Sequence, residues 1–179
     1  MKRNTLLGNL FAFAAVFAGS AAVAPGASAG SGAAPTADPA AAVNAANDSF
    51  YAALNAMFVG EFEPMNAIWS HRDDVTLMSP FGGRLVGWDA VGAEWKRESG
   101  LKLGGRVLCK DLLVRVGGDM AYTVGVEEGE NMTADGKPVA VRFRATNIFR
   151  LEAGQWHLVH HHTDTSQSLQ SATFTDQGK

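Results

Sequence analysis

Four strand-like runs follow Gly104-Gly105, and they constrain the fold more than any other feature of the chain. Each run alternates apolar and polar residues or is rich in β-branched ones, which is typical of strands. The runs cover residues 107–116, 120–130, 139–151 and 156–163. The joins carry turn residues: Gly117-Gly118-Asp119, Asp135-Gly136 and Glu152-Ala153-Gly154. Because short joins of this kind favour hairpins, the runs predict an antiparallel meander.

Helical patterns precede these runs. Asp38 can cap a helix that starts at Pro39, and apolar residues at helical spacing continue to Met57. A second helix is predicted over 63–69, a short strand over 75–78, and a third helix after Gly87. Helices followed by an antiparallel meander indicate an α+β fold. We therefore expect three N-terminal helices packed on a strongly curved, mostly antiparallel sheet.

The N-terminal 29 residues have the three parts of a secretory signal peptide. Lys2 and Arg3 precede an apolar stretch, and Ala27-Ser28-Ala29 forms a small-residue cleavage site. A membrane anchor is the alternative, although Gly19 and Ser20 interrupt the apolar stretch. We expect cleavage near Ala29 and a secreted or periplasmic protein. The mature chain then has a flexible segment over 30–41, one domain over 42–166, and a polar tail over 167–179.

Charge and cysteine content limit the partners and the means of stabilisation. The formal net charge is −3, and removal of the signal peptide removes bases but no acids. Because the chain has no basic stripe, we do not expect it to bind nucleic acid. We also expect no membrane association after cleavage. Cys109 is the only cysteine, so packing rather than an intrachain disulfide must hold the fold.

Three sequence segments resemble one known family. They are Ile68-Trp69-Ser70-His71 with Asp73-Asp74-Val75-Thr76, Pro80-Phe81-Gly82-Gly83 with Gly87-Trp88-Asp89, and Gly154-Gln155-Trp156 with Val159-His160-His161-His162. Their order resembles the SnoaL-like and nuclear-transport-factor-2-like superfamily, the cystatin-like α+β cone of ketosteroid isomerases. The closing strand is similar to that of the calcium/calmodulin-dependent kinase association domain. The resemblance implies a conical pocket between helices and sheet, and a homodimer through the outer sheet face.

Four of the five histidines lie in the last run. Simple alternation places His157, Val159, His161 and Thr163 on one face of the strand, and His160, His162 and Asp164 on the other. Three interpretations remain open: structural hydrogen bonds at the sheet surface, acid–base chemistry by His161, and a metal site formed by His160, His162 and Asp164. No fourth ligand is evident, so we expect no metal and no cofactor.

The candidate site residues follow from these faces and from the resemblance. As catalytic residues we expect His161, with Tyr51 as a donor and Asp111 as an acid. Asp73, Asp74 and Glu128 are the other acids considered. The predicted pocket lining comprises Trp69, Trp95, Val124, Asn147, His161 and Thr163. Such a lining favours a small apolar or aromatic molecule.

Two functions from different classes fit these features. The first is a cofactor-independent isomerase, dehydratase or hydrolase that acts on an apolar substrate. The second is a non-catalytic module for ligand binding or oligomeric assembly. Fold alone does not decide between them, because the superfamily contains both.

Overall fold

The computed structural model describes residues 38–134 and 136–169. The predicted signal peptide, its cleavage site and most of the predicted tail lie outside these ranges. The elements are α1 (Pro39–Met57), α2 (Glu63–Ile68), β1 (Thr76–Met78), β2 (Arg84–Val86), α3 (Trp88–Ser99), β3 (Arg106–Gly117), β4 (Met120–Glu130), β5 (Thr133–Ala134), β6 (Lys137–Pro138), β7 (Arg142–Glu152) and β8 (Gln155–Asp164). No helix within the described ranges is both long enough and apolar enough to cross a membrane.

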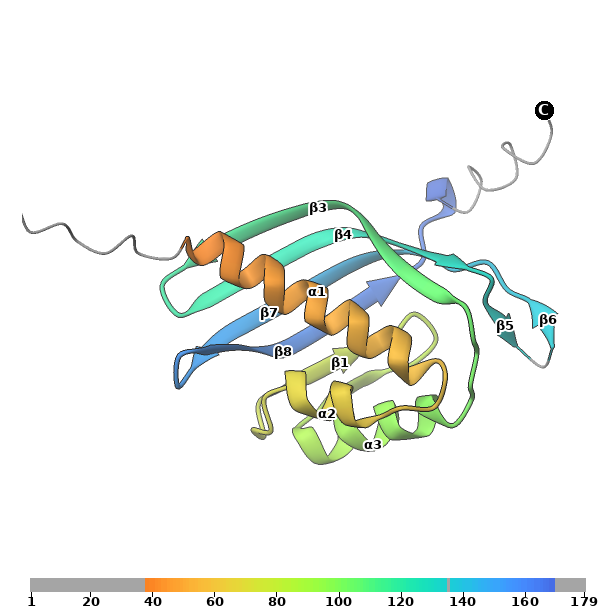
Figure 1. The fold of residues 1–179 in the computed structure, drawn as a ribbon, viewed down its shortest axis with the longest axis horizontal. Coiled ribbons are helices and arrows are strands. Elements are labelled where there is room, and N and C mark those ends of the chain that lie inside the picture. The colour runs from red at the N-terminus through yellow and green to blue at the C-terminus, as the bar shows by residue number, and fades with distance from the viewer. Residues whose placement is uncertain (1–37, 135, 170–179) are drawn as a thin grey trace, which may run out of the picture. The chain divides into compact units, whose positions relative to one another are not determined.

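The six-stranded sheet has the order β2-β1-β8-β7-β4-β3. All neighbours are antiparallel except β1 and β8, which pair in parallel and set Leu77 beside His161. The expected α+β fold is confirmed, with three helices before a large, mostly antiparallel sheet (Figure 1). The sequence did not predict β2, which follows the turn residues Ser79-Pro80-Phe81-Gly82-Gly83 directly. It completes the edge of the sheet by pairing with β1.

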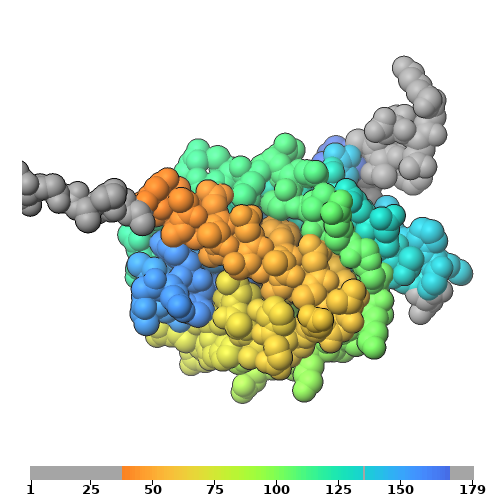
Figure 2. All heavy atoms as spheres, viewed as in Figure 1, coloured from red at the N-terminus to blue at the C-terminus, as the bar shows by residue number. Residues whose placement is uncertain are grey.

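Helix α1 crosses one face of the long strands and supplies much of the core (Figure 1). It begins as expected, with the Asp38 side chain accepting from the Ala40 backbone N–H at 3.0 Å. Because the helix starts at Pro39, the last residues of the segment expected to be flexible over 30–41 are helical. Its own Phe50 and Met57 side chains are fully buried. The outward side of α1 lies at the surface and continues towards α2 (Figure 2).

Two irregularities change which side chains face inward. The run predicted to start at residue 139 enters the sheet only at Arg142, after the small β5–β6 hairpin. In β8, Phe149 pairs with Leu158 and Ile148 with His160, so the bulge leaves Val159 without a partner. A bulge residue reverses the alternation of a strand. The predicted common face of His157 and His161 is therefore wrong: Leu158 and His161 share the inner face.

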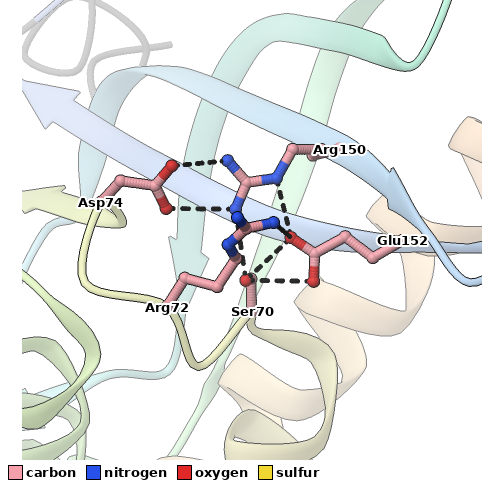
Figure 3. A network of polar contacts seen from close by, with 5 residues as sticks. All are labelled: Ser70, Arg72, Asp74, Arg150 and Glu152. Atoms are coloured by element: carbon pink, nitrogen blue, oxygen red, sulfur yellow. Dashed lines mark hydrogen bonds and ion pairs between the residues drawn. The ribbon is translucent and has the colours of Figure 1, made fainter.

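A polar network fixes the loop before β1 to the sheet (Figure 3). Arg150 donates two hydrogen bonds to the Asp74 carboxylate, at 2.8 and 3.1 Å, and a third to Glu152 at 2.7 Å. Ser70 donates to Glu152, and Arg72 lies 3.9 Å from the same carboxylate. The hydrogen bonds from Arg150 lower the pKa of Asp74. Asp74 is thus an ionised structural group rather than a pocket acid.

Candidate functional site

A cluster of buried polar side chains lies between α1 and the inner face of the sheet. We call it the polar cluster; its members are Asn47, Tyr51, Thr123, Glu127, Asn147 and His161. Helix α1 supplies two of them one turn apart, so both point the same way. The other four come from β4, β7 and β8, which are neighbours in the sheet. Four elements distant in sequence therefore converge on one site.

Glu127 and Tyr51 form the acidic part of the polar cluster. The Tyr51 hydroxyl donates to Oε1 of Glu127 at 3.1 Å. Glu127 is only 4% exposed, and burial raises its pKa to about 7, although the Tyr51 hydrogen bond opposes the shift. Burial and the Glu127 charge both raise the pKa of Tyr51. The phenol therefore keeps its proton while Glu127 exchanges one near neutral pH.

His161 is held in one tautomer beside this pair. Its Nδ1 lies 2.6 Å from Oδ1 of Asn147. The Asn147 amide nitrogen donates to Oδ1 of Asn47 at 3.0 Å. Because Asn147 presents its oxygen, Nδ1 carries the proton and Nε2 keeps its lone pair. Nε2 is 3.9 Å from Oε1 of Glu127. Burial lowers the pKa of His161 to about 3, so the ring is neutral.

Asn47 is the hub that positions these groups. Its Oδ1 accepts from Thr123 Oγ1 at 3.0 Å and from Asn147 Nδ2 at 3.0 Å. The chain of hydrogen bonds thus runs from β4 through α1 to β7 and ends on the His161 ring. Buried networks of this kind fix orientation strongly, because each member would be costly to leave unpaired.

Aromatic rings surround the His161 side of the cluster. The Phe50 and Trp95 ring centroids lie 4.9 and 5.8 Å from that of His161. Trp69 packs on Trp95 at 6.2 Å. Four expected lining residues, Trp69, Trp95, Asn147 and Thr163, are all buried on the inner side of the sheet. The structure therefore brings them together with His161 and Tyr51.

Two predicted site residues lie elsewhere. Asp111 is exposed at a bulge in β3, with a φ of 52°, and Val124 alternates with the inward-facing Thr123. Both line an open hollow of about 510 Å³ that also includes His162 and Asp164. Because alternate residues of a strand point to opposite faces, Val124 cannot share the inner face with Thr123. The prediction that Asp111 and Val124 face the interior is therefore wrong, because both line this hollow.

Glu127, Asn47 and Thr123 were missed by the sequence analysis. Glu128 was considered instead, yet it faces outward and lies 3.2 Å from Arg142. The signal was present in β4: Ala121 and Thr123 begin an inward set that includes Glu127 at the same parity. The signal for Asn47 was its position four residues after Val43, on the apolar face of α1.

The remaining histidines of β8 lie outside the polar cluster. His160 Nδ1 is 2.7 Å from Oγ1 of Thr76, on the face opposite His161. The Asp164 carboxylate accepts two hydrogen bonds from the Arg144 guanidinium, at 2.8 and 2.6 Å. Within 38–134 and 136–169, no three His, Cys, Asp or Glu side chains are grouped to hold a metal ion.

The raised pKa of Glu127 predicts a pH-dependent stability. Its contribution is fully present below the ordinary value of 4.5 and is lost as pH rises through about 7. At about 1.4 kcal/mol per pKa unit, the loss by pH 8 amounts to a few kcal/mol. His161 acts oppositely, because its lowered pKa removes stability as pH falls below 6.5.

Urea unfolding at pH 5 and pH 8 measures this effect. Relative to the wild type, Glu127→Gln should be about equally stable at pH 5, where the buried carboxyl is protonated, and more stable at pH 8, where it is ionised. Since His161 is present in both proteins, the comparison isolates Glu127. The same wild-type-to-variant difference at the two pH values would contradict the assignment.

Comparisons with a family model and with solved structures agree on one family. A family model described as a SnoaL-like domain matches residues 43–164. A structure from Thiobacillus denitrificans, assigned as a calcium/calmodulin-dependent protein kinase type II association domain, is 30% identical. It has a TM-score of 0.59, with 69% of this chain and 94% of that chain covered. No curated protein matched the sequence.

Two further structures extend the comparison. One from Streptomyces avermitilis, assigned as a dehydratase of the NTF2-like family, is 26% identical with a TM-score of 0.62. The match covers 72% of this chain and 96% of that chain. A protein from Shewanella frigidimarina, assigned as a ketosteroid isomerase, is 15% identical with a TM-score of 0.56, covering 69% and 94% of the two chains. This last likeness concerns the fold alone.

Proposed function

Because the chain belongs to the SnoaL-like domain family, we propose that it is a cofactor-independent proton-transfer enzyme acting on a small, largely apolar molecule. One observation carries the proposal: Glu127, with a pKa near 7, lies buried beside the Tyr51 donor and neutral His161. A general base works best when its pKa is close to the working pH. The surrounding aromatic rings suit an apolar substrate.

The chemistry assigned to the cluster is isomerisation or dehydration. The Glu127 carboxylate takes a proton from a substrate C–H bond, and the electron pair of that bond is delocalised into the substrate. Return of the proton to a different carbon completes an isomerisation. In a dehydration, the electron pair instead expels hydroxide, which leaves as water with the Tyr51 proton, and Tyr51 recovers a proton from Glu127. Both sequences balance without a cofactor.

The similar structures support this choice of reaction class. The neighbour assigned as a dehydratase shares 26% of its residues over most of its length. A hydrolase remains within the same proposal, since a base that accepts a proton from carbon also accepts one from water. His161 contributes an unprotonated Nε2 that accepts a substrate hydroxyl or a shared proton.

Deuterium exchange tests the proposal directly. The purified protein is incubated in D₂O with a panel of apolar ketones, esters and β-hydroxy compounds, and deuterium uptake at carbon is followed by proton NMR. We expect enzyme-dependent uptake for at least one class, with a rate that rises as Glu127 ionises around pH 7. Uptake no faster than in buffer across the panel would contradict the proposal.

We also propose that the protein acts after export, in the periplasm or outside the cell. The charged start, the apolar stretch and Ala27-Ser28-Ala29 support this localisation. N-terminal sequencing of the exported protein should give Gly30 as the first residue.

An assembly module is the second candidate function, and the outer sheet face favours it. Tyr122 is 44% exposed on this face, with Leu113 also exposed and Val126 half-buried nearby. The Thiobacillus denitrificans structure, assigned as an association domain, is 30% identical. We propose a homodimer in which two copies cover these faces, because self-complementary apolar patches are typical of two-fold interfaces.

Oligomeric state in solution tests this interface. Light scattering should give a dimer for the wild type and a monomer for Tyr122→Arg, because an arginine would bury its charge twice across a two-fold axis. Leu101→Arg, an exposed leucine just beyond α3, is the matched control and should remain dimeric. A monomeric wild type would contradict the dimer.

A further inference from the structure

Three buried hydrogen-bond donors lie in the described part of the interior without a partner. The indole N–H groups of Trp69 and Trp95, and Nδ2 of Asn47, have no acceptor among the described residues. All three residues are buried, and Trp95 is only 3% exposed. A buried donor without an acceptor lowers stability, so its presence calls for a partner. These unpartnered donors therefore indicate what kind of atom the interior is arranged to bind.

No acceptor of the polar cluster accepts a hydrogen bond from these three donors. Oδ1 of Asn47 accepts two hydrogen bonds, and Oδ1 of Asn147 accepts from His161. Oε1 of Glu127 accepts from Tyr51. Nε2 of His161 keeps its lone pair, but no hydrogen bond joins it to either indole. The unpartnered donors thus require an acceptor that a bound molecule brings.

The charge of the interior limits that acceptor to an uncharged group. Among the described residues, none of the buried polar side chains is Lys or Arg. A carboxylate or phosphate would therefore enter without a compensating cation, at a high desolvation cost. Glu127 would add repulsion once it is ionised. A carbonyl oxygen accepts hydrogen bonds and carries no net charge.

We propose that the Trp95 indole N–H binds the carbonyl oxygen of an uncharged substrate. Trp95 lies between Trp69 and His161, with ring centroids at 6.2 and 5.8 Å, and Nε2 of His161 is 3.9 Å from Glu127. This inference rests on the proposed function. A donor on the carbonyl stabilises the negative charge that forms on its oxygen when Glu127 removes a proton from the adjacent carbon.

The test compares three small probes of similar shape: acetophenone, ethylbenzene and benzoate. They are titrated into ¹⁵N-labelled protein, with the indole resonances followed by NMR. Acetophenone should bind about tenfold more tightly than ethylbenzene, because only the ketone accepts a hydrogen bond. Benzoate should bind more weakly than acetophenone. The Trp95 indole proton should shift downfield with acetophenone and not with ethylbenzene.

A variant then assigns the preference to one donor. In Trp95→Phe the acetophenone preference over ethylbenzene should fall below about twofold, since the ring is largely kept and only the donor is lost. Trp88→Phe is the matched control on the same helix; Trp88 stacks on His71 outside the cluster, so its preference should be unchanged. The indole shift is read in the wild type, so a folding defect in the variant leaves the test intact.

Three results would overturn the proposal: no binding of acetophenone, benzoate binding as tightly as acetophenone, or an unchanged preference in folded Trp95→Phe. Failure of the proposed function is distinguishable, because it concerns turnover. A ketone preference that depends on Trp95, together with no deuterium exchange, would retain the binding assignment and reject the catalytic one. Glu127→Gln should keep acetophenone binding and lose exchange.

Discussion

Replacement of Glu127 by Gln is expected to lower the rate of deuterium exchange at carbon by about 10²–10⁴-fold, the range that general-base catalysis supplies. The amide is similar in size and can still accept from Tyr51 through its oxygen, as Glu127 does at 3.1 Å. It cannot take a proton from carbon. The loss should therefore appear in kcat, with the affinity for the substrate largely kept.

Glu128→Gln is the matched control for this experiment. Glu128 lies one residue along the same strand, but it faces outward and pairs with Arg142. Its exchange rate should stay within about twofold of the wild type, since surface ion pairs contribute little. Equal losses in the two variants, or full exchange in Glu127→Gln, would remove Glu127 from the proposed mechanism.

Replacement of Asn47 by Ala is expected to destabilise the fold by about 2–4 kcal/mol. The change removes the oxygen that accepts from Thr123 and Asn147, and it leaves both donors buried without a partner. It also frees the Asn147 amide to turn, so His161 loses the contact that fixes its tautomer. Urea unfolding measures the stability, and ¹⁵N chemical shifts of the His161 ring report the tautomer.

Asn44→Ala provides the comparison on the same helix. Asn44 is half-buried, and its amide donates to the Ala40 carbonyl at 2.9 Å rather than to a strand. Its loss should cost less than about 1 kcal/mol and leave the His161 signals unchanged. A similar cost for both asparagines would mean that the hub contributes no more than a surface hydrogen bond.

The fold could be predicted from sequence because its signals are local. The Asp38 cap, the helical spacing of α1 and the glycine-rich joins between long strands each act within a few residues. The short strands β2, β5 and β6 were missed, although Asp135-Gly136 was expected to join a hairpin.

The site was predicted less completely, for a physical reason that β8 illustrates. A single bulge at Val159 reverses the strand's alternation, which places Leu158 and His161 on the same face. Sequence alternation cannot show where a bulge falls. The bulge in β3 has the same effect on Asp111, which turns outward. The interior positions of Asn147, His161 and Tyr51 agree with the expectation, which for His161 and Tyr51 came from the family resemblance.

For Glu127 the strand pattern was present in the sequence, but it was not used to choose between two adjacent acids. Two adjacent acids occupy positions 127 and 128, and only the tertiary fold reveals that the first is buried under α1. The parity of Ala121 and Thr123 favours Glu127, yet Glu128 was the acid considered. The Tyr51 contact across 76 residues resolves it.

The protonation of Glu127 is the property on which the account depends most directly. Carbon-13 NMR of the glutamate side-chain carboxyls, with Glu127→Gln to assign the signal, follows that protonation across pH. We expect the Glu127 carboxyl to titrate with a midpoint near 7, because burial raises its pKa. A midpoint near the ordinary value of 4.5 would place a charged, solvated carboxylate at this position and would contradict the buried base that we propose.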